Sequence, residues 1–204
     1  MPIADTEPRP ESLGHVARSL NVDILRMNRY ASSFSGDRVT WMRRLGTLLT
    51  PPLLCSALYR LSHWLYMKRW RGAARCLALL NYGMHKAAIA PAARIGPGLY
   101  IPHTVGVVFY GHAGRNLTLY GRAMIMPSSV RDWLGPISED SPRLGDGITV
   151  GAGSVVIGTI SIGSRAKIGS RVPVLESLPA GSVLAHPIDR TAVGSASLVA
   201  EPER

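Results

Sequence analysis

The sequence has few of the residues that would place it in several common protein classes. Only two of its 204 residues are cysteines, Cys55 and Cys76, and their surroundings are unlike each other. Neither a disulfide framework nor a metal-binding spacing is indicated, so we expect a reducing compartment and no metal. The N-terminus lacks the basic-then-apolar order of a signal peptide. The longest apolar stretch, "LLTPPLLCSALY", is too short and too interrupted by proline to span a bilayer, and a cytoplasmic location is expected.

Acidic residues are absent from the middle of the chain. None lies between Asp37 and Asp132, an interval that holds thirteen Lys and Arg, and the formal net charge is +10. A positive field of this breadth attracts anions such as phosphates and anionic lipid headgroups. The sequence shows no nucleic-acid-binding module and no aromatics interleaved with basic residues on one face, so nucleic acid is not an expected partner.

Residues from about 10 to 86 have the periodicity of helices. We expect a helical region over 1–86, with roughly the first ten residues disordered. The segment 53–84 favours a helix packed within its own domain or on a sister subunit, with a solvated basic face. It also fits a helix lying on an anionic membrane at the inner face, with aromatics at the headgroup level. The apolar side carries Leu54, Leu58, Leu61 and Leu65; the basic side Arg60, Lys68, Arg69, Arg71 and Arg75; the aromatics are Trp64, Tyr66 and Trp70.

From Ile89 onward the hydrophobic pattern has a period of six. No helix has this period and a simple strand alternates at two, whereas six fits one side of a triangular coil built from short strands and turns. Small residues, often glycine, follow the aliphatic ones and allow the tight corners. The pattern predicts a parallel β-helix of about five coils over 87–193, followed by a tail over 194–204. The aliphatic positions are Ile89, Ile95, Ile101 and Val107, then Leu119 and Ile125 after Ala113, and finally Leu144, Val150, Val156, Ile162, Ile168 and Val174.

An inserted loop separates the two runs. Ile125 and Leu144 are nineteen residues apart, which is out of phase with a period of six. The intervening "PSSVRDWLGPISEDSPR", residues 127–143, has the proline, serine and charge of a loop. Solenoids often place such insertions on the binding face.

Three stretches of the β-helix region resemble the serine acetyltransferases of the hexapeptide acyltransferase superfamily. They are "AIAPAARIGPGLYIPHTVGVV", "SPRLGDGITVGAGSVVIGTISIGSRAKIG" and "LESLPAGSVLAHPIDR". The preceding "LYRLSHWLYMKRWRGAARCLALLNYGM" is similar to the helical lead-in of the exopolysaccharide-cluster members. The resemblance implies a mainly β protein: a left-handed parallel β-helix of hexapeptide repeats with an N-terminal α-helical region. It also implies a homotrimer, either alone or paired as a dimer of trimers, and acetyl transfer from acetyl-CoA, bound between neighbouring prisms, to a hydroxyl.

The resemblance assigns roles to individual residues. His103 matches the general base of the family, whereas Pro102 stands where the family has an aspartate. Asp140 and Ser141 stand where it has an arginine and a second histidine. We place these two on the acceptor side together with His112, the second candidate base, and Trp133, which either stacks on a sugar or anchors the loop. The expected coenzyme-binding residues are Gly151, Ala152, Lys167, Ser170 and Arg190.

The chemistry of acetyl transfer also favours His103. The acceptor hydroxyl must lose its proton, and an imidazole with a pKa of about 6.5 can take it at neutral pH. His103 follows the inward-facing Ile101 by two residues, which should turn it outward, towards a neighbouring prism. Its second ring nitrogen needs a partner, for which the candidates are a backbone carbonyl or a loop carboxylate, from this or another subunit. The loop carboxylates are those of Asp132, Glu139 and Asp140.

Three functions remain open. The first is O-acetylation of a saccharide hydroxyl, on an exopolysaccharide or a lipid-linked sugar, because Pro102 and Ser141 argue against free serine. A basic helix on the membrane would bring such an enzyme to its acceptor. The second is a serine O-acetyltransferase of cysteine biosynthesis. The third is a non-catalytic trimeric scaffold.

Overall fold

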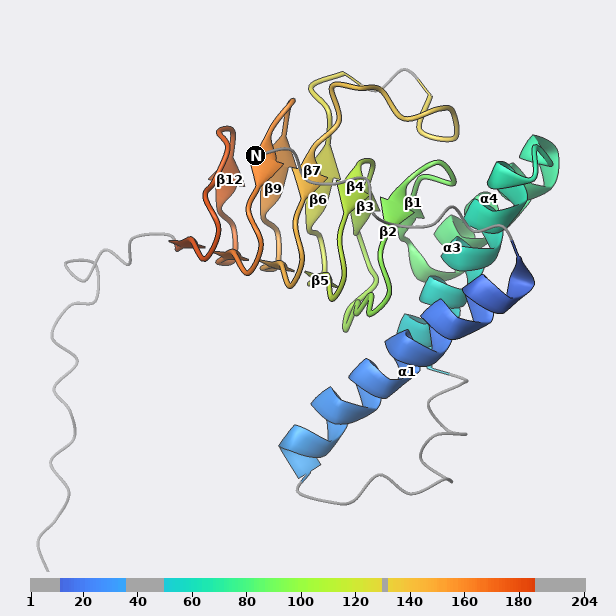
Figure 1. Cartoon of the computed structure of the whole chain (residues 1–204), viewed down its shortest axis with the longest axis horizontal. Coiled ribbons are helices and arrows are strands. Elements are labelled where there is room, and N and C mark those ends of the chain that lie inside the picture. Colours follow the sequence, from blue (N-terminus) through green and yellow to red (C-terminus); the bar gives the residue numbers. More distant parts are fainter. Residues whose placement is uncertain (1–11, 36–49, 130–131, 186–204) are drawn as a thin grey trace, which may run out of the picture.

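Helices stand at one end of a three-sided β prism (Figure 1). The computed structural model describes residues 12–35, 50–129 and 132–185. The expected disorder at the N-terminus, the tail over 194–204 and the candidate Arg190 lie outside these described residues. The described helices are α1 (Leu13–Ser35), α3 (Pro51–Met67) and α4 (Arg71–His85).

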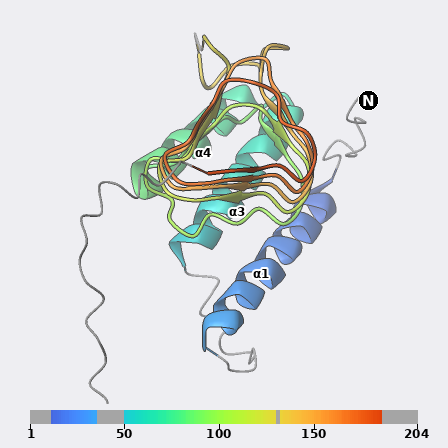
Figure 2. The same cartoon turned by 90° about the vertical axis from the view of Figure 1, so that its left-hand side faces the viewer.

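The strands form three parallel sheets, which are the three sides of the prism (Figure 2). Each of the middle turns of the chain adds one short strand to each side, whereas the first and last turns have an isolated bridge on one side, at Tyr100 and at Leu178. Every pairing between described strands is parallel, as a β-helix requires. The first sheet holds β1 (Ala88–Ile89), β3 (Val108–Phe109), β6 (Met124–Met126), β9 (Val155–Ile157) and β12 (Pro173–Val174). The second holds β2 (Arg94–Ile95), β4 (His112–Ala113), β7 (Arg143–Leu144) and β10 (Ser161–Ile162). The third holds β5 (Thr118–Leu119), β8 (Thr149–Val150), β11 (Lys167–Ile168) and β13 (Val183–Leu184).

The interior of the prism is filled by the aliphatic residues at the expected six-residue positions. In the second run of repeats these side chains are at most 2% exposed. Stacking of successive coils places them directly above one another, because parallel strands hold their residues in register. The buried members of this run are Leu144, Val150, Val156, Ile162, Ile168 and Val174.

One position of the predicted period is wrong. Val107 is buried, but the strand position on the first sheet belongs to Phe109, which is paired with Ile89 on one side and Ile125 on the other. The corner between Ile101 and Phe109 therefore spans eight positions in place of six, and the next side, from Phe109 to Ala113, spans four. We call the enlarged turn, residues 102–107, the His103 corner.

The segment 53–84 is not one helix. The chain reverses at the turn between α3 and α4, where Arg69 adopts a left-handed backbone conformation with φ of 66°. The two helices pack against each other as a hairpin, and the Ser62 hydroxyl donates a hydrogen bond to the Ala74 carbonyl at 2.9 Å. None of the helices in the described residues has the length and apolar character that crossing a membrane demands.

The buried side of α3 also differs from the expected one. Arg60, expected on a solvated basic face, is buried and pairs with Asp23 of α1 at 2.9 Å. Leu61, expected on the packed side, is exposed. The reason is tertiary: the coil corner beneath α3 presents backbone carbonyls, and Arg60 donates to those of Ile95 and Gly96 at 2.8 and 2.9 Å. The side chains of α3 that are buried are Leu53, Cys55, Ser56, Tyr59, Arg60 and Ser62.

The expected loop projects from the prism between β6 and β7, and it ends at Pro142 because Arg143 already belongs to β7 (Figure 1). It is held against α4 at two points. Arg75 forms an exposed ion pair with Asp132 at 2.8 Å, and the rings of Tyr82 and Trp133 lie 6.2 Å apart.

Candidate functional site

His103 lies exposed at the edge of the prism where the third sheet turns into the first. The same edge is built by the corners that follow β5, β8 and β11. Backbone hydrogen bonds join these corners from coil to coil: Arg122 donates to Val105, Gly153 to Gly121 and Arg171 to Ala152, at 2.9 to 3.0 Å. We call this line of corners the His103 edge.

The His103 edge brings the candidate base together with most of the expected coenzyme-binding residues. Gly151, Ala152 and Ser170 lie on it, and the latter two are exposed. Lys167 is exposed on β11, on the adjoining outer face of the third sheet. Residues that are 48 to 67 positions from His103 in the sequence are therefore aligned along one side of the molecule.

Gly121 is a residue of this edge that the sequence reading missed. A Cβ atom at position 121 would lie 3.2 Å from the Cβ of His103, closer than side chains ordinarily pack. Glycine at 121 thus leaves room for the histidine on the neighbouring coil. The signal was present in the sequence, since Gly121 follows Leu119 by two residues just as His103 follows Ile101.

The stacking of the coils requires glycine at position 151, whatever role this residue has in binding. A Cβ atom there would lie 2.6 Å from the backbone of Gly169 and Ser170 on the next coil. Contacts this short do not occur between real atoms, so the coil can close here only over a glycine.

The imidazole of His103 has no hydrogen-bond partner among the described residues of its own chain. The loop carboxylates named as candidates lie at a different edge, where the first sheet turns into the second. Asp132 there is paired with Arg75, and Glu139 lines a separate cleft. The described part of the loop therefore does not deliver a carboxylate to His103 of the same chain.

The expected acceptor-side residues do not gather around His103 within one chain. Trp133 packs against Tyr82 and the core, and so anchors the loop. Asp140 is exposed, whereas Ser141 is buried and its hydroxyl has no hydrogen-bond partner among the described residues. His112 lies on β4, on the outer face of the second sheet.

His112 lines a cleft of about 320 Å³ beside the loop, which we call the loop cleft. Arg94 and Arg143 line it on the strands at either side of His112. Tyr66 and Met67 of α3 form one wall. Residues 136–139 of the loop form another wall.

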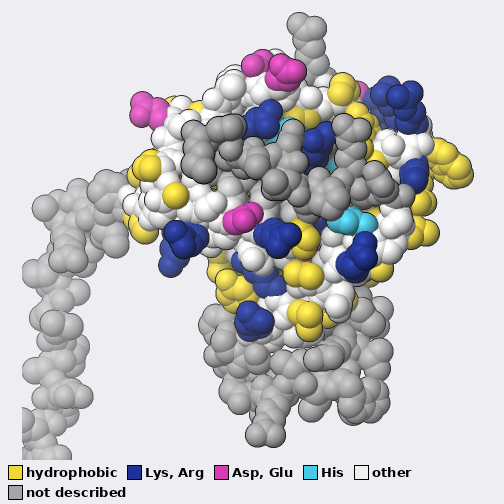
Figure 3. Space-filling model, viewed as in Figure 1, with side chains coloured by type: hydrophobic (Ala, Val, Ile, Leu, Met, Phe, Trp, Pro, Cys, Tyr) yellow, Lys and Arg dark blue, Asp and Glu magenta, His cyan; other side chains and the backbone are white. Residues whose placement is uncertain are grey.

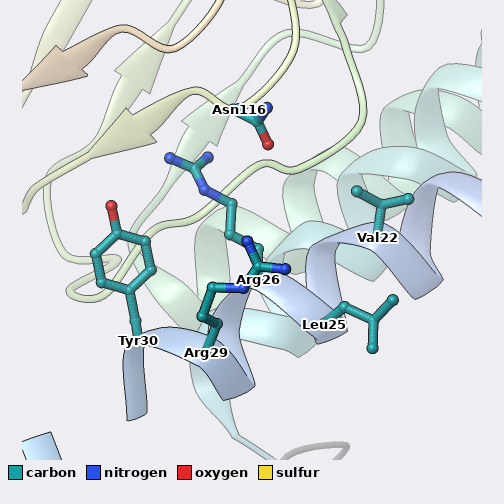
Figure 4. Close-up of a pocket in the computed structure, with 6 residues that line it drawn as sticks. All are labelled: Val22, Leu25, Arg26, Arg29, Tyr30 and Asn116. Atoms are coloured by element: carbon teal, nitrogen blue, oxygen red, sulfur yellow. The ribbon is translucent and has the colours of Figure 1, made fainter. Parts of the chain in front are cut away.

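A second cleft, of about 600 Å³, lies between α1 and the prism (Figure 4). Arg26 reaches from α1 across it towards the coil that carries Asn116, and donates to the carbonyls of Gly98 and Leu117 and to the Thr118 hydroxyl. Tyr30 stacks on Tyr100 of the prism with ring centroids 4.7 Å apart. Arg26 and Tyr30 thus hold the helix on the prism.

The cysteines do not form part of a catalytic group. Burial raises the pKa of the Cys55 thiol to about 12, so it stays protonated and unreactive at neutral pH. Cys76 is exposed on α4, on the helical part of the molecule. Neither thiol lies on the His103 edge. The described residues also contain no cluster of potential metal ligands.

Comparison with known proteins points to one family. No family model matches the chain. The serine acetyltransferase of Helicobacter pylori strain 26695 is 36% identical over 150 residues, which are 72% of this chain and 80% of the relative. That of Salmonella typhimurium is 33% identical over 122 residues, 59% of this chain but only 43% of the relative. This chain thus spans most of one curated relative and less than half of the other.

Solved structures agree in fold. Serine acetyltransferase from Brucella abortus, in complex with coenzyme A, superposes with a TM-score of 0.74 at 23% identity, covering 87% of this chain and 68% of that one. The Neisseria gonorrhoeae enzyme in complex with serine gives 0.69 at 24% identity, covering 83% and 66%. These neighbours confirm the left-handed parallel β-helix.

The prism, its coil corners and these relatives make the chain an acyltransferase of the hexapeptide-repeat class. The match to the Helicobacter pylori protein runs through most of both sequences. The chain belongs to the serine acetyltransferase family.

Proposed function

We propose that this chain transfers an acetyl group from acetyl-CoA to an acceptor hydroxyl, with His103 as the general base. The observation that carries the proposal is the position of His103, exposed on the same edge as Ala152 and Ser170. A base must reach the acceptor's proton while the thioester lies alongside, and one edge of the prism offers both. We assign stabilisation of the oxyanion to backbone N–H groups of these corners that are not used between coils.

The donor is placed along the His103 edge. Coenzyme A is bound in the Brucella abortus relative of the same fold. Its phosphates are anionic, and Lys167 and Arg190 supply positive charge in the C-terminal coils and the segment after them. We place acetyl-CoA between the prisms of a homotrimer, either alone or paired as a dimer of trimers. A neighbouring subunit would also supply the partner that the His103 imidazole lacks among the described residues of its own chain.

For the acceptor we propose a saccharide hydroxyl. Pro102 leaves no carboxylate beside His103, and Asp140 and Ser141 carry no positive charge where the resemblance implies an arginine and a histidine. Free serine brings a carboxylate, which Asp140 would repel and for which the uncharged Ser141 supplies no cation. The helical lead-in resembles that of exopolysaccharide-cluster members, and this resemblance also favours a saccharide acceptor. Serine remains the second candidate, because the matched relatives are named serine acetyltransferases and the Neisseria gonorrhoeae structure holds serine.

Release of the coenzyme A thiol, measured with serine and with a panel of saccharides, tests both parts. We expect turnover with a saccharide and little with serine. Robust turnover with serine would overturn the proposed saccharide acceptor but leave the proposed acetyltransferase activity standing. Binding of acetyl-CoA without turnover on any acceptor would favour the non-catalytic scaffold.

We also propose that the α3–α4 turn docks on an anionic membrane. Trp70 is 68% exposed there and is flanked by the exposed cations Lys68, Arg69 and Arg71. Figure 3 shows Lys and Arg side chains gathered beside hydrophobic ones at this end of the molecule. An exposed indole between cations suits the headgroup region of anionic lipids. The contact point is thus the turn, and not a long helix lying flat as the sequence suggested.

Sedimentation with phosphatidylserine-containing vesicles at low salt tests the docking. We expect binding that is lost in Trp70→Ser and in the triple change of Lys68, Arg69 and Arg71 to Gln. The control removes exposed charge elsewhere, by Arg115→Gln with Arg165→Gln at another corner of the prism. Equal loss in the control would show a general charge effect and overturn the docking site.

A further inference from the structure

Two cations flank the candidate base on the His103 edge. The carbonyl of Lys86, just after α4, accepts the N–H of Gly106 at 2.9 Å, so Lys86 begins the line of corners one step before His103. Arg122 lies one step after it, and its N–H donates to the Val105 carbonyl of the His103 corner. Both side chains are exposed, and neither has a side-chain hydrogen bond or an ion pair among the described residues.

The side chain of Arg122 runs back over the His103 corner. A Cβ atom at Gly106 would lie 3.0 Å from Cγ of Arg122, so the stem of the arginine packs on this glycine. His103 stacks in the same way on Gly121, the residue that precedes Arg122. Adjacent coils are about 4.8 Å apart, so the guanidinium and the imidazole are close enough to contact one small ligand together.

Packing of the stem accounts for a long side chain at position 122, but not for its charge. Arg165 makes the same contact at the edge between the second and third sheets, where its Cγ would lie 3.6 Å from a Cβ atom at Gly147. Both arginines are exposed and have a left-handed backbone, with φ of 62° and 63°. Arg165 is therefore a matched reference on an edge that lacks the candidate base.

No carboxylate of the described residues balances the charge of the His103 edge. Their acidic side chains lie on α1, on the loop or at the other two edges of the prism, and are those of Asp23, Asp132, Glu139, Asp140, Asp146 and Glu176. When the thioester of acetyl-CoA is at His103, the phosphates lie a pantetheine arm away, towards the C-terminal coils. Lys86 and Arg122 are then left beside the acceptor, where they attract an anionic group.

We propose that the acceptor is an acidic saccharide, whose carboxylate or phosphate group is bound by Arg122 with Lys86 beside it. The proposal rests on the proposed function and names the substrate class of the same site. A guanidinium binds two oxygens of either anion through its fork of N–H donors. In a saccharide the acidic group can lie several bonds from the acetylated hydroxyl and so reach Arg122, whereas the carboxylate of serine is fixed close to its hydroxyl. Anchored in this way, the sugar presents its hydroxyl to His103.

Imidazole NMR signals of the full chain, saturated with coenzyme A, report acceptor binding without turnover. Glucuronic acid, glucose 1-phosphate, glucose and serine are titrated in turn at constant ionic strength. We expect saturable shifts of the His103 signals with an acidic sugar and at least tenfold weaker binding of glucose. The tighter of the two acidic sugars identifies the anion as a carboxylate or a phosphate.

Three variants test the part of Arg122. Arg122→Gln should weaken binding of the acidic sugar at least tenfold, and Arg122→Lys, which keeps the charge but loses the fork, should lose less. Arg165→Gln is the matched control and should leave the affinity unchanged. An equal loss in Arg165→Gln would overturn the proposal by showing attraction to the general positive field. Weaker binding of coenzyme A in Arg122→Gln would also overturn it, by assigning this arginine to the acyl donor.

The unmodified chain offers further outcomes against the proposal. It is wrong if neither acidic sugar gives saturable shifts, if glucose binds equally well, or if serine alone binds. Failure of the proposed function has a different signature, because binding does not require turnover. A sugar acid that binds through Arg122 without release of thiol from acetyl-CoA would overturn acetyl transfer and leave the binding site standing.

Discussion

The carboxylate of Asp23 and the guanidinium of Arg60 form an ion pair buried between the helices and the first coil of the prism, with Nε and Oδ2 2.9 Å apart. The other oxygen of Asp23 accepts the backbone N–H groups of Gly98 and Leu99 at 2.7 and 2.8 Å. Arg60 in turn donates to two carbonyls of the same corner. One acid on α1 and one base on α3 thus fix both helices to the prism.

Removal of one partner should be strongly destabilising. In Arg60→Met the Asp23 charge stays buried without its guanidinium, and we expect a loss of about 3–5 kcal/mol in the free energy of unfolding. Denaturant unfolding measures it. The exposed pair of Arg75 and Asp132 is the control, and Arg75→Met should cost about 1 kcal/mol or less. Similar losses for the two variants would contradict a special role for the buried pair.

His103→Asn should abolish most of the turnover while leaving the fold and donor binding intact. General base catalysis contributes roughly 10²- to 10⁴-fold, so kcat should fall by that factor. Binding of coenzyme A, followed by calorimetry, should change little, because the proposed role of the imidazole is towards the acceptor hydroxyl and not towards the coenzyme. His15→Gln, on α1, is the comparison variant and should keep full turnover. A His103→Asn enzyme of normal kcat would remove His103 from the mechanism.

Gly151→Ala and Gly72→Ala should shift stability in opposite directions. At Gly151 the new methyl would lie 2.6 Å from the backbone of the next coil, and overpacking of this kind costs about 1–3 kcal/mol. At Gly72, on α4, nothing lies within 4 Å of the new atom, and alanine in a helix gains roughly 0.5–1 kcal/mol over glycine. Thermal unfolding of the two variants separates these effects, and a stable Gly151→Ala protein would contradict the tight stacking of the corners.

Stability should fall as the pH drops from about 6.5 to about 4. Burial between α3 and the prism lowers the pKa of His63 to about 4, and its Nδ1 lies 2.8 Å from the Pro91 carbonyl oxygen. In this interval the His63 imidazole is protonated in the unfolded chain but neutral in the native state, so the unfolding free energy decreases with falling pH. The loss is at most on the order of 3 kcal/mol at pH 4.

His63→Asn is the variant that checks this titration, because an amide keeps a donor near the Pro91 carbonyl and does not titrate. It should flatten the dependence of the unfolding free energy on pH in the same interval. Burial also lowers the pKa of His85, which leaves a smaller slope of the same sign. An unchanged slope in His63→Asn would assign the effect to other groups.

The period of six was enough to predict the prism, but not its irregular corner. Aliphatic residues at fixed steps can be read directly, because each fills the same interior position on successive coils. Val107 fits that step and is aliphatic, so nothing in the sequence distinguishes it from Phe109, which holds the strand position. Only the pairing with Ile89 and Ile125 settles which residue lies in the sheet.

Sites that depend on distant partners were harder to predict. Arg60 follows the pattern of a solvated face, and its buried state depends on Asp23, thirty-seven residues earlier. Arg94 and His112 are eighteen residues apart, the length of a regular coil, so their stacking was open to prediction. Arg143 joins them only through a loop whose path the composition does not specify.

The His103 corner shows how the chain can change the length of a turn without disturbing its stack. From Ile89 to Phe109 the first coil uses twenty positions, and from Phe109 to Ile125 the second uses sixteen, so together they equal two coils of eighteen. The long corner and the short side after it therefore cancel, and Ile89, Phe109 and Ile125 remain direct partners in the first sheet. The residues outside the strands take up the difference, as the loop between Ile125 and Leu144 also does, since both of these side chains still face the interior. The corners of the prism are thus the places where the chain can lengthen or shorten while its core keeps the same stack.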